Sequence, residues 1–346
     1  MPRFASSVVA AGTIPANVNA LIATTLPKVQ PSIVDNFFNA TPFFWWMKDK
    51  GRADTWDGGE SIEIPVMYDG NPNAKAYDQY EVMDATPPQG IGTTVWRMAH
   101  YRVPIMYSRN TAVSNRGDSA VVNLIAALKQ QAELSLTSAI NTDLFTTSRT
   151  VNNKLIYSMY QVVDETASAS QTLIIGGILR TTYTWWRNMY ISCCSASASA
   201  GLGLAQSLRM LYAQCENGSD HPDLGLCDRA TMWNLEGKLA TSIRFVNQRA
   251  AEFGFDNMTY KGMTIMSDQA ILDDDYNADG DGSLFLLNTK YLKLMLGSDA
   301  NFKVLAPEYD KWQDAFIGAI LVDIQLTCSN CKRQGSLKGG AYGLAT

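Results

Sequence analysis

The chain has 346 residues, of which 46% are hydrophobic and 18% are charged, and its formal net charge is −5. That length can bury a sizeable core and can hold two or three domains. The low charged fraction and the many apolar residues exclude disorder over most of the chain. The acidic balance excludes tight binding of nucleic acid through phosphate contacts, because such binding needs a concentrated basic face.

The histidines, cysteines and hydropathy exclude further classes of protein. The sequence has two histidines, His100 and His221, whereas most zinc hydrolases use two or three as ligands. Six cysteines are too few for a disulfide scaffold. No segment reaches the roughly 18 apolar residues that cross a bilayer, and the N-terminus lacks a signal-peptide core. We therefore expect a protein made and folded in a cytoplasm, without a membrane partner.

Residues 1–55 are expected to form an arm and not a packed domain. They are rich in Ala, Asn, Thr and Pro, and their periodicity is weak. An aromatic group stands in this arm and consists of Phe37, Phe38, Phe43, Phe44, Trp45 and Trp46. Such side chains cannot form a core alone and are not left in water. The arm therefore either folds against its own domain or docks on a neighbouring subunit.

Two alternating runs predict a long β-hairpin within residues 56–110. The first strand, residues 61–68, has an apolar face made of Ile62, Ile64, Val66 and Tyr68. The second, residues 93–107, alternates throughout except at Arg97. The polar connection is too long for a tight turn, so the hairpin is expected to project from the body. Because a lone ribbon is marginal in water, we expect its apolar face to rest on a neighbouring subunit.

The remaining elements favour an α+β fold. A long helix is predicted over residues 118–147, where apolar residues recur at helical spacing without Pro or Gly. A second helix is predicted over residues 203–217, and the last long strand over Ala315–Leu326. Strands and helices follow no regular alternation, which argues against a doubly wound sheet.

No catalytic motif is recognisable in the sequence. It contains no P-loop, no GxSxG and no HExxH, and neither histidine stands in a motif that aims a nucleophile. Cys328 and Cys331 form a CxxC, but a zinc site needs a second such pair, so we expect plain cysteines at the end of a strand. We therefore expect no enzyme activity, no cofactor, and no catalytic or metal-binding residues.

The acidic segment Asp273–Asp281 matches the first half of a calcium loop. Asp275, Asn277, Asp279 and Gly280 stand at the expected spacing. The twelfth position, however, is Leu286 where a calcium loop has a bidentate Glu. We therefore expect a solvated acidic turn that binds no calcium. A chelator should then leave the stability of the protein unchanged.

Several stretches of the second half, taken in order, carry a resemblance to a known family: His221–Cys227, Phe253–Phe255, Tyr260–Ile265, Ser283–Asn288, Lys290–Leu294, Asp314–Phe316 and Asn330–Gly335. Their order and spacing resemble the major capsid proteins of tailed bacteriophages, which have the HK97-like fold. The first half is similar to the same family by its arm, hairpin and long helix. The resemblance therefore covers nearly the whole chain.

The resemblance implies an α+β, HK97-like capsid fold divided into five segments. These are an N-terminal arm (1–55), a projecting β-hairpin called the E-loop (56–110), a P-domain with its spine helix (111–170), an A-domain (171–305), and a C-terminal strand that returns to the P-domain (306–346). Implied subunit-interface residues lie in the arm and the hairpin: Ile62, Ile64, Val66, Tyr68, Val103, Phe43, Trp45 and Trp46.

The resemblance also implies a function and partners. The protein is expected to be the major capsid protein of a bacteriophage, a structural protein that self-assembles as pentamers and hexamers into an icosahedral shell around packaged double-stranded DNA. It is expected in the virion capsid, after assembly in the host cytoplasm. Because the arm starts at the beginning of the sequence, a separate scaffolding protein is expected, with a portal and decoration proteins. Some family members join subunits through a Lys–Asn isopeptide bond; Lys75 could be a donor, but no motif supports this chemistry here.

Two alternatives remain open at this stage. An encapsulin-like shell of a cellular compartment shares the fold and packages enzymes, although the sequence shows no groove for a cargo peptide. An enzyme or carbohydrate-binding protein of mixed α+β type is the other alternative, and the missing catalytic motif argues against the enzyme.

Overall fold

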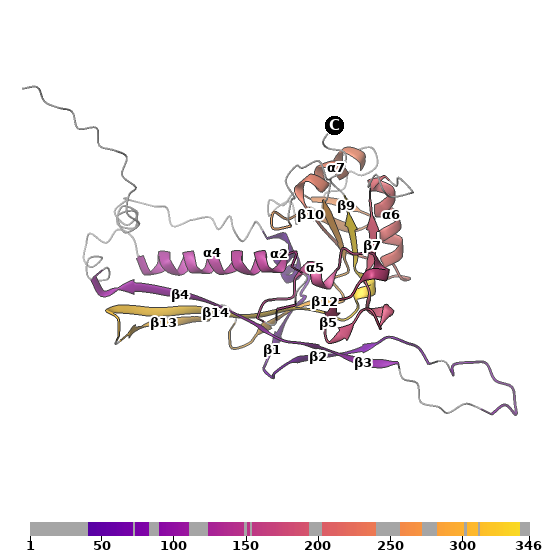
Figure 1. Ribbon diagram of the computed structural model, residues 1–346, viewed down its shortest axis with the longest axis horizontal. Coiled ribbons are helices and arrows are strands. Elements are labelled where there is room, and N and C mark those ends of the chain that lie inside the picture. Colours follow the sequence, from indigo (N-terminus) through magenta and orange to yellow (C-terminus); the bar gives the residue numbers. More distant parts are fainter. Residues whose placement is uncertain are drawn as a thin grey trace, which may run out of the picture. The chain divides into compact units, whose positions relative to one another are not determined.

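The computed structural model describes residues 41–71, 73–82, 90–110, 124–148, 151–152, 154–193, 203–239, 257–271, 282–300, 303–310 and 312–339. The chain divides into two compact units (Figure 1). The smaller unit contains Val103–Ser135 and Val304–Ile320, and the larger contains Asn36–Arg102, Leu136–Lys303 and Leu321–Thr346. The five-segment division expected from the sequence stays a prediction. None of the described helices has the length and apolar character needed to span a membrane.

The larger unit contains a six-stranded mixed sheet with two helices beside it. Its strands, in spatial order, are β7 (Met189–Ser192), β15 (Gly335–Lys338), β11 (Ser283–Leu287), β8 (Leu224–Cys227), β10 (Met263–Ser267) and β9 (Asn257–Tyr260). Every residue of β8 and β11 is buried, as expected of central strands covered on both faces. Helix α6 (Leu204–Cys215) contacts β7 and β15, and α7 (Arg229–Leu239) contacts α6 and β10. The prediction of a helix over residues 203–217 is confirmed by α6.

A second sheet has five strands: β1 (Ala53–Trp56), β12 (Leu292–Gly297), β14 (Ala315–Cys328), β13 (Lys303–Asp310) and β4 (Ala99–Ser108). Within the larger unit, β1 runs parallel to β12, and β12 pairs antiparallel with the end of β14. Within the smaller unit, β13 lies next to the beginning of β14. The long final strand predicted from the sequence is thus confirmed by β14.

The helices agree with their sequence patterns where they are described. Helix α4 spans Leu124–Leu144 and matches the described part of the predicted long helix. Helix α2 spans Pro42–Asp49 and begins with a proline at its first turn, where the missing N–H costs nothing. Its residue Phe43 is fully buried and meets the ring of Phe145 edge-on, with 6.5 Å between ring centroids. This part of the arm therefore folds against its own unit, while residues 1–40 lie outside the described residues.

Short elements connect α4 to the six-stranded sheet. They are α5 (Met159–Val162), η2 (Ser168–Ser170), β5 (Ile174–Ile175), β6 (Ile178–Leu179) and η3 (Thr184–Trp186), and a last short helix, η4 (Cys331–Arg333), follows β14. Ser158 begins α5 with a capping box: Ser158 Oγ accepts from Gln161 N, and Gln161 Oε1 accepts from Ser158 N. Strands β5 and β6 pair with each other as a small hairpin.

The single second strand predicted over residues 93–107 is wrong. The chain forms two strands there: β3 (Ile91–Trp96) pairs with β2 (Ile62–Met67), while β4 pairs with β14 in the other sheet. Trp96, Met98 and Ala99 are all buried, a pattern that one alternating strand does not allow. At the break, the carbonyl of Arg97 accepts a hydrogen bond from Nε2 of Gln325 on β14. The exception at Arg97 in the sequence pattern marks this break.

The inner face of the β2–β3 hairpin packs within its own chain. Its buried members are Ile62, Val66, Thr94 and Trp96. The Trp96 ring meets Tyr157 edge-on, with 5.1 Å between ring centroids. Gly176 approaches so closely that a Cβ there would lie 3.0 Å from the Trp96 ring, and its φ of +58° also favours glycine. Residues of the same chain thus cover much of this apolar face, and the expectation that it rests on a neighbouring subunit stays a prediction.

We expect Val66→Asp to destabilise the chain itself by roughly 3 kcal/mol or more, because a carboxylate would replace buried methyl groups. The adjacent variant Met67→Asp lies on the opposite, exposed face and should change the free energy of unfolding by less than about 0.5 kcal/mol. Chemical denaturation of both variants in one buffer measures the difference. Equal stability of the two variants would contradict the assignment of the inner face.

Candidate functional site

The interface residues predicted from the sequence fall into two groups. Phe43, Trp46, Ile62 and Val66 are buried within the chain, and Trp45, Ile64, Tyr68 and Val103 keep exposed surface. The first four have little area left for a neighbour. The part that any of the eight plays in a subunit interface stays a prediction.

Tyr68 is held by aromatic residues of its own chain. Its ring stacks on Trp185, with 4.7 Å between centroids and 10° between ring planes. Trp185 also meets Tyr183 and the buried Trp186 edge-on. Because Tyr68 follows β2 directly, this stack fixes the point at which the chain leaves the hairpin strands.

The outer face of the hairpin exposes three apolar side chains beside Glu63, which stands opposite Val95. Met67 and Ile91 stand directly opposite each other in the strand register, and each is 76% exposed. Val95 on the same face is 40% exposed. In the sequence, Met67 is the signal for this face, because it is an apolar residue that alternates with Val66 and Tyr68. We call Met67, Ile91 and Val95 the outer face.

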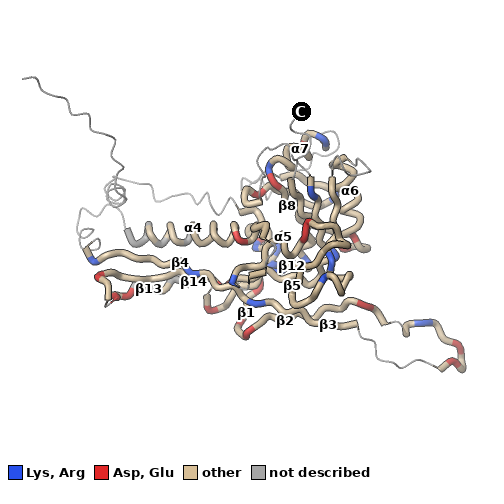
Figure 2. The backbone as a smooth tube through the Cα atoms, viewed as in Figure 1, with Lys and Arg blue, Asp and Glu red and all other residues tan. Residues whose placement is uncertain are grey.

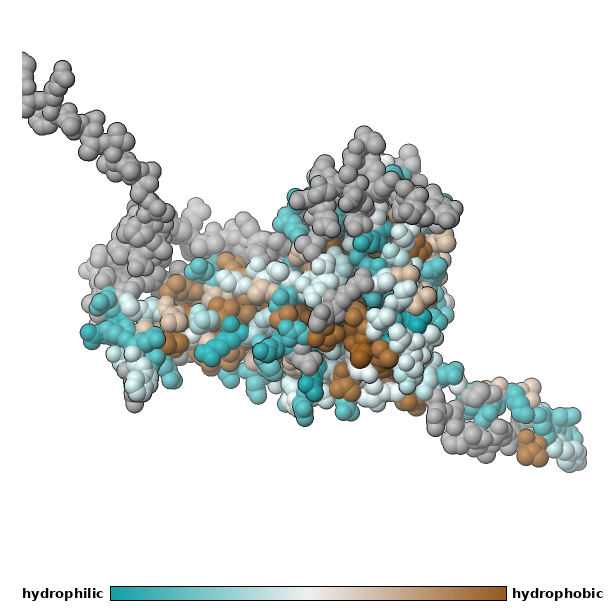
Figure 3. Space-filling model, viewed as in Figure 1, coloured by the Kyte–Doolittle hydropathy of each residue, from teal (hydrophilic) through white to brown (hydrophobic). Residues whose placement is uncertain are grey.

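The connection beyond these strands carries further exposed apolar side chains. Tyr80 is 95% exposed, and Tyr77 and Val82 are exposed as well. Figure 3 shows hydrophobic surface on this connection among hydrophilic residues. Lys75 Nζ forms an ion pair with Glu81 Oε1 at 2.7 Å, six residues further along this connection.

The smaller unit has an exposed aromatic end at the turn between β13 and β14. Trp312 is 94% exposed, and its backbone N–H donates to Asp310 Oδ1. Nearby, Tyr309 donates to Asp314 Oδ1 and meets the Phe316 ring edge-on. The turn is therefore ordered by its own contacts, while the Trp312 side chain is left in water.

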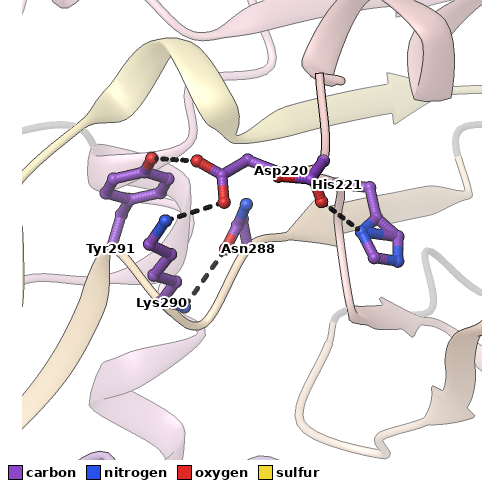
Figure 4. Close-up of polar contacts among 6 residues, drawn as sticks. Asp220, His221, Asn288, Lys290 and Tyr291 are labelled. Atoms are coloured by element: carbon purple, nitrogen blue, oxygen red, sulfur yellow. Dashed lines mark hydrogen bonds and ion pairs between the residues drawn. The ribbon is translucent and has the colours of Figure 1, made fainter. Parts of the chain in front are cut away.

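A polar cluster fixes the chain where it passes from β11 to β12 (Figure 4). Asp220 lies between Lys290 and Tyr291: Lys290 Nζ and the Tyr291 hydroxyl each donate to it at 2.7 Å. These hydrogen bonds lower the pKa of Asp220 below its ordinary value. Asp223 accepts from both the backbone N–H and the hydroxyl of Thr289. The turn between the two sheets of this unit is thus held by two carboxylates.

The two histidines make simple polar contacts. His221 Nδ1 lies 3.3 Å from the carbonyl of Ser219 and points away from Asp220 (Figure 4). His100 Nδ1 lies 2.7 Å from Asp323 Oδ1, and the His100 side chain is mostly exposed. Within the described ranges, no three His, Cys, Asp or Glu side chains are grouped as metal ligands. The acidic segment Asp273–Asp281 lies outside the described residues, so its assignment as a solvated turn without calcium stays a prediction.

Asp268 is a buried carboxylate that no sequence motif marks. It follows β10, and its Oδ1 accepts from the backbone N–H of Ala270 at 2.9 Å. Its Oδ2, and Oδ1 of the adjacent Asn141 on α4, are both buried without a hydrogen-bond partner in the described structure. Burial raises the pKa of Asp268 to about 6, although the hydrogen bonds from Ala270 and Asn141 oppose this rise.

Comparison with solved structures gives several matches over most of the chain. A chain of the cyanophage A-1(L) capsid asymmetric unit has a TM-score of 0.64 and 14% identity, covering 94% of this chain and 99% of that chain. A chain of the native GTA particle capsid has a TM-score of 0.55 and 10% identity, covering 91% and 92%. The SrpI encapsulin complex of Synechococcus elongatus PCC 7942 gives a TM-score of 0.56 at 8% identity, covering 93% and 94%.

The chain has the HK97-like fold. No protein-family model and no curated protein matches the chain, so its HK97-like fold is shown by the three-dimensional structure. The α+β fold class expected from the sequence is confirmed.

The pKa of Asp268 predicts how stability depends on pH. In the folded state the Asp268 carboxyl group keeps its proton up to about pH 6, whereas an Asp in the unfolded chain loses its proton near pH 4. Stability therefore falls as pH rises between these values, and the loss is complete above about pH 6. We expect Asp268→Asn to be more stable than the wild type at pH 7 by roughly 1–3 kcal/mol, with no difference below about pH 4.

Asp220→Asn is a control of opposite sign for this experiment. The pKa of Asp220 is lowered, so its contribution is present at pH 7 and is lost as the carboxylate is protonated in acid. This variant should be less stable than the wild type at pH 7. Thermal melts from pH 3 to pH 8 compare the three proteins, and a D268N variant that is less stable at pH 7 would contradict the assignment.

Proposed function

We propose that this chain is a shell subunit, the major capsid protein of a tailed bacteriophage. In this proposal it assembles as pentamers and hexamers into an icosahedral shell around double-stranded DNA and is a component of the virion. The observation that carries the proposal is the near-complete structural match to the cyanophage capsid chain, which covers 94% of this chain and 99% of that one. No large part of either chain is left over for an unrelated activity.

The exposed apolar residues support self-association. Large side chains on the outer face, on the hairpin connection and at Trp312 stand in water in the single chain. Apolar groups exposed in this way mark interaction surfaces. In the proposed shell, the outer face with Met67 and Ile91 contacts a neighbouring copy, while the inner face holds the hairpin to its own subunit.

The distribution of charge supports a container and not a tight DNA-binding protein. Figure 2 shows basic and acidic residues interspersed over the described part of the chain, and the net charge is −5. Strong phosphate contacts would resist both packaging and release of DNA. We propose that contacts with DNA are non-specific, that the chain is not an enzyme, and that scaffolding, portal and decoration proteins are separate partners.

The first test asks whether the outer face drives assembly. Met67→Asp with Ile91→Asp places two carboxylates directly opposite each other on that face, where they would oppose burial against a neighbour. We expect the double variant to remain folded, with an unchanged melting temperature, and to sediment as small species under conditions in which the wild type forms shells or rings. Sedimentation velocity and negative-stain electron microscopy measure this.

The matched control is Met67→Leu with Ile91→Leu, which keeps both positions apolar and should assemble normally. If the Asp variant assembles as well as the Leu variant, the outer face is not a subunit contact. If the wild type stays monomeric at high concentration with its scaffold present, the shell function itself is contradicted. Nuclease-protected DNA in particles from infected cells supports a virus capsid, whereas a protein cargo supports the encapsulin-like alternative.

A further inference from the structure

A buried arginine lies beside a pair of cysteines at the end of β14. Cys328 is the last residue of β14 and Cys331 the first residue of η4, and both are fully buried. Their Sγ atoms lie 3.7 Å apart, in hydrogen-bond contact. Arg180, which follows β6, is also fully buried, and its guanidinium faces Cys331. The end of β14, the start of η4 and the residue after β6 thus meet at one point.

The charge of Arg180 lacks a carboxylate partner. Its two terminal nitrogens donate to the carbonyls of Gln161 and Val162, and its Nε has no hydrogen-bond partner in the described structure. Among the described residues, no carboxylate lies within ion-pair distance of Arg180. A buried guanidinium without a counter-charge is costly. An ionised Cys331 would supply that counter-charge.

The two thiols have different acidities for the same reason. Burial raises the pKa of Cys331, but the hydrogen bond between the two thiols and the charge of Arg180 outweigh it, so the pKa of Cys331 lies below its ordinary value. Burial and the adjacent Cys331 raise the pKa of Cys328 well above its ordinary value. At Cys215, another buried thiol, burial outweighs the charge of Arg333 and raises the pKa to about 12.

We propose that Cys331 and Cys328 form a redox-active dithiol, in which Cys331 is the attacking thiolate and Cys328 the resolving thiol. We name a small peroxide as the oxidant, because both thiols are fully buried and a larger oxidant would not reach them. A zinc site is not supported, since no third ligand of the His, Cys, Asp or Glu type joins the pair in the described chain.

The reaction balances with hydrogen peroxide as the oxidant. The Cys331 thiolate attacks one peroxide oxygen; an S–O bond forms, the O–O bond breaks, and hydroxide leaves and takes up a proton. Cys328, after losing its proton, attacks Sγ of Cys331 and displaces the second oxygen as water. The net change is two thiols and one peroxide to one disulfide and two waters. The sulfur atoms then close to a bond length of about 2.05 Å.

Arg180 stabilises the thiolate and therefore the reduced state. A disulfide whose reduced form is stabilised is easily reduced again, so the pair should remain a dithiol in a reducing cytoplasm. For a shell released from the cell, oxidation would follow release; this last consequence rests on the proposed function, whereas the chemistry of the pair does not.

The first measurement is the thiolate absorbance at 240 nm between pH 5 and pH 9. The difference between the wild type and Cys331→Ser should titrate with a midpoint below about pH 8.5, the ordinary pKa of a thiol. Arg180→Met should reduce the thiolate content at pH 7 by about tenfold or more, and Arg180→Lys, which keeps the charge, should restore part of it. If no difference between wild type and C331S develops below pH 9, the thiolate assignment is overturned.

The second measurement needs no arginine variant and follows peroxide treatment by peptide mass analysis. The peptide that contains both cysteines should lose two hydrogens, at a rate at least about tenfold above oxidation of Cys215. In Cys328→Ser, Cys331 should gain one oxygen, because the resolving thiol is missing. In Cys331→Ser, Cys328 should stay unmodified. Oxidation of the pair no faster than Cys215 overturns the proposal, whether or not the chain assembles.

Discussion

The burial of Trp96 in its own chain is the interaction on which the arrangement of the hairpin depends. Its Nε1–H donates to Thr94 Oγ1 at 3.0 Å, its ring meets Tyr157, and Gly176 leaves the space that the ring occupies. A large aromatic side chain that is fully buried and hydrogen-bonded is worth several kcal/mol. Trp96 therefore anchors the end of β3 and decides which face of the ribbon turns inward.

The same anchor separates two strands that the sequence presents as one. Gln325 on β14 donates to the carbonyl of Arg97, and its Oε1 accepts from the backbone N–H groups of Tyr157 and Leu326. The side-chain amide of Gln325 thus satisfies the backbone carbonyl at the break. The chain can therefore leave the β2–β3 ribbon and continue as β4. Because Trp96 has turned inward, Met67 and Ile91 are left outside. The exposure of these apolar residues follows from this one choice of face.

Local patterns were sufficient to predict the elements but not their partners. The alternation of residues 61–68, the helical spacing of α4 and α6, and the long final strand could all be read from the sequence, because each depends on periodicity within one segment. The break at Arg97 depends on Gln325, and the acidity of Cys331 depends on Arg180; both partners come from distant parts of the chain. No local pattern encodes such contacts. The sequence pattern around Cys328 and Cys331 therefore indicates only two cysteines at the end of a strand, because it does not show that Arg180 lies beside them.

We propose that the hairpin has an inner face that packs within its own subunit and an outer face that contacts the next copy. An electron cryo-microscopy reconstruction of the assembled particle tests this division most directly. The account predicts Trp96 buried against Tyr157 and Gly176 of its own chain, with Met67 and Ile91 in contact with an adjacent copy. A reconstruction in which the outer face is in solvent, and the Ile62–Trp96 face lies on a neighbouring copy, would contradict it.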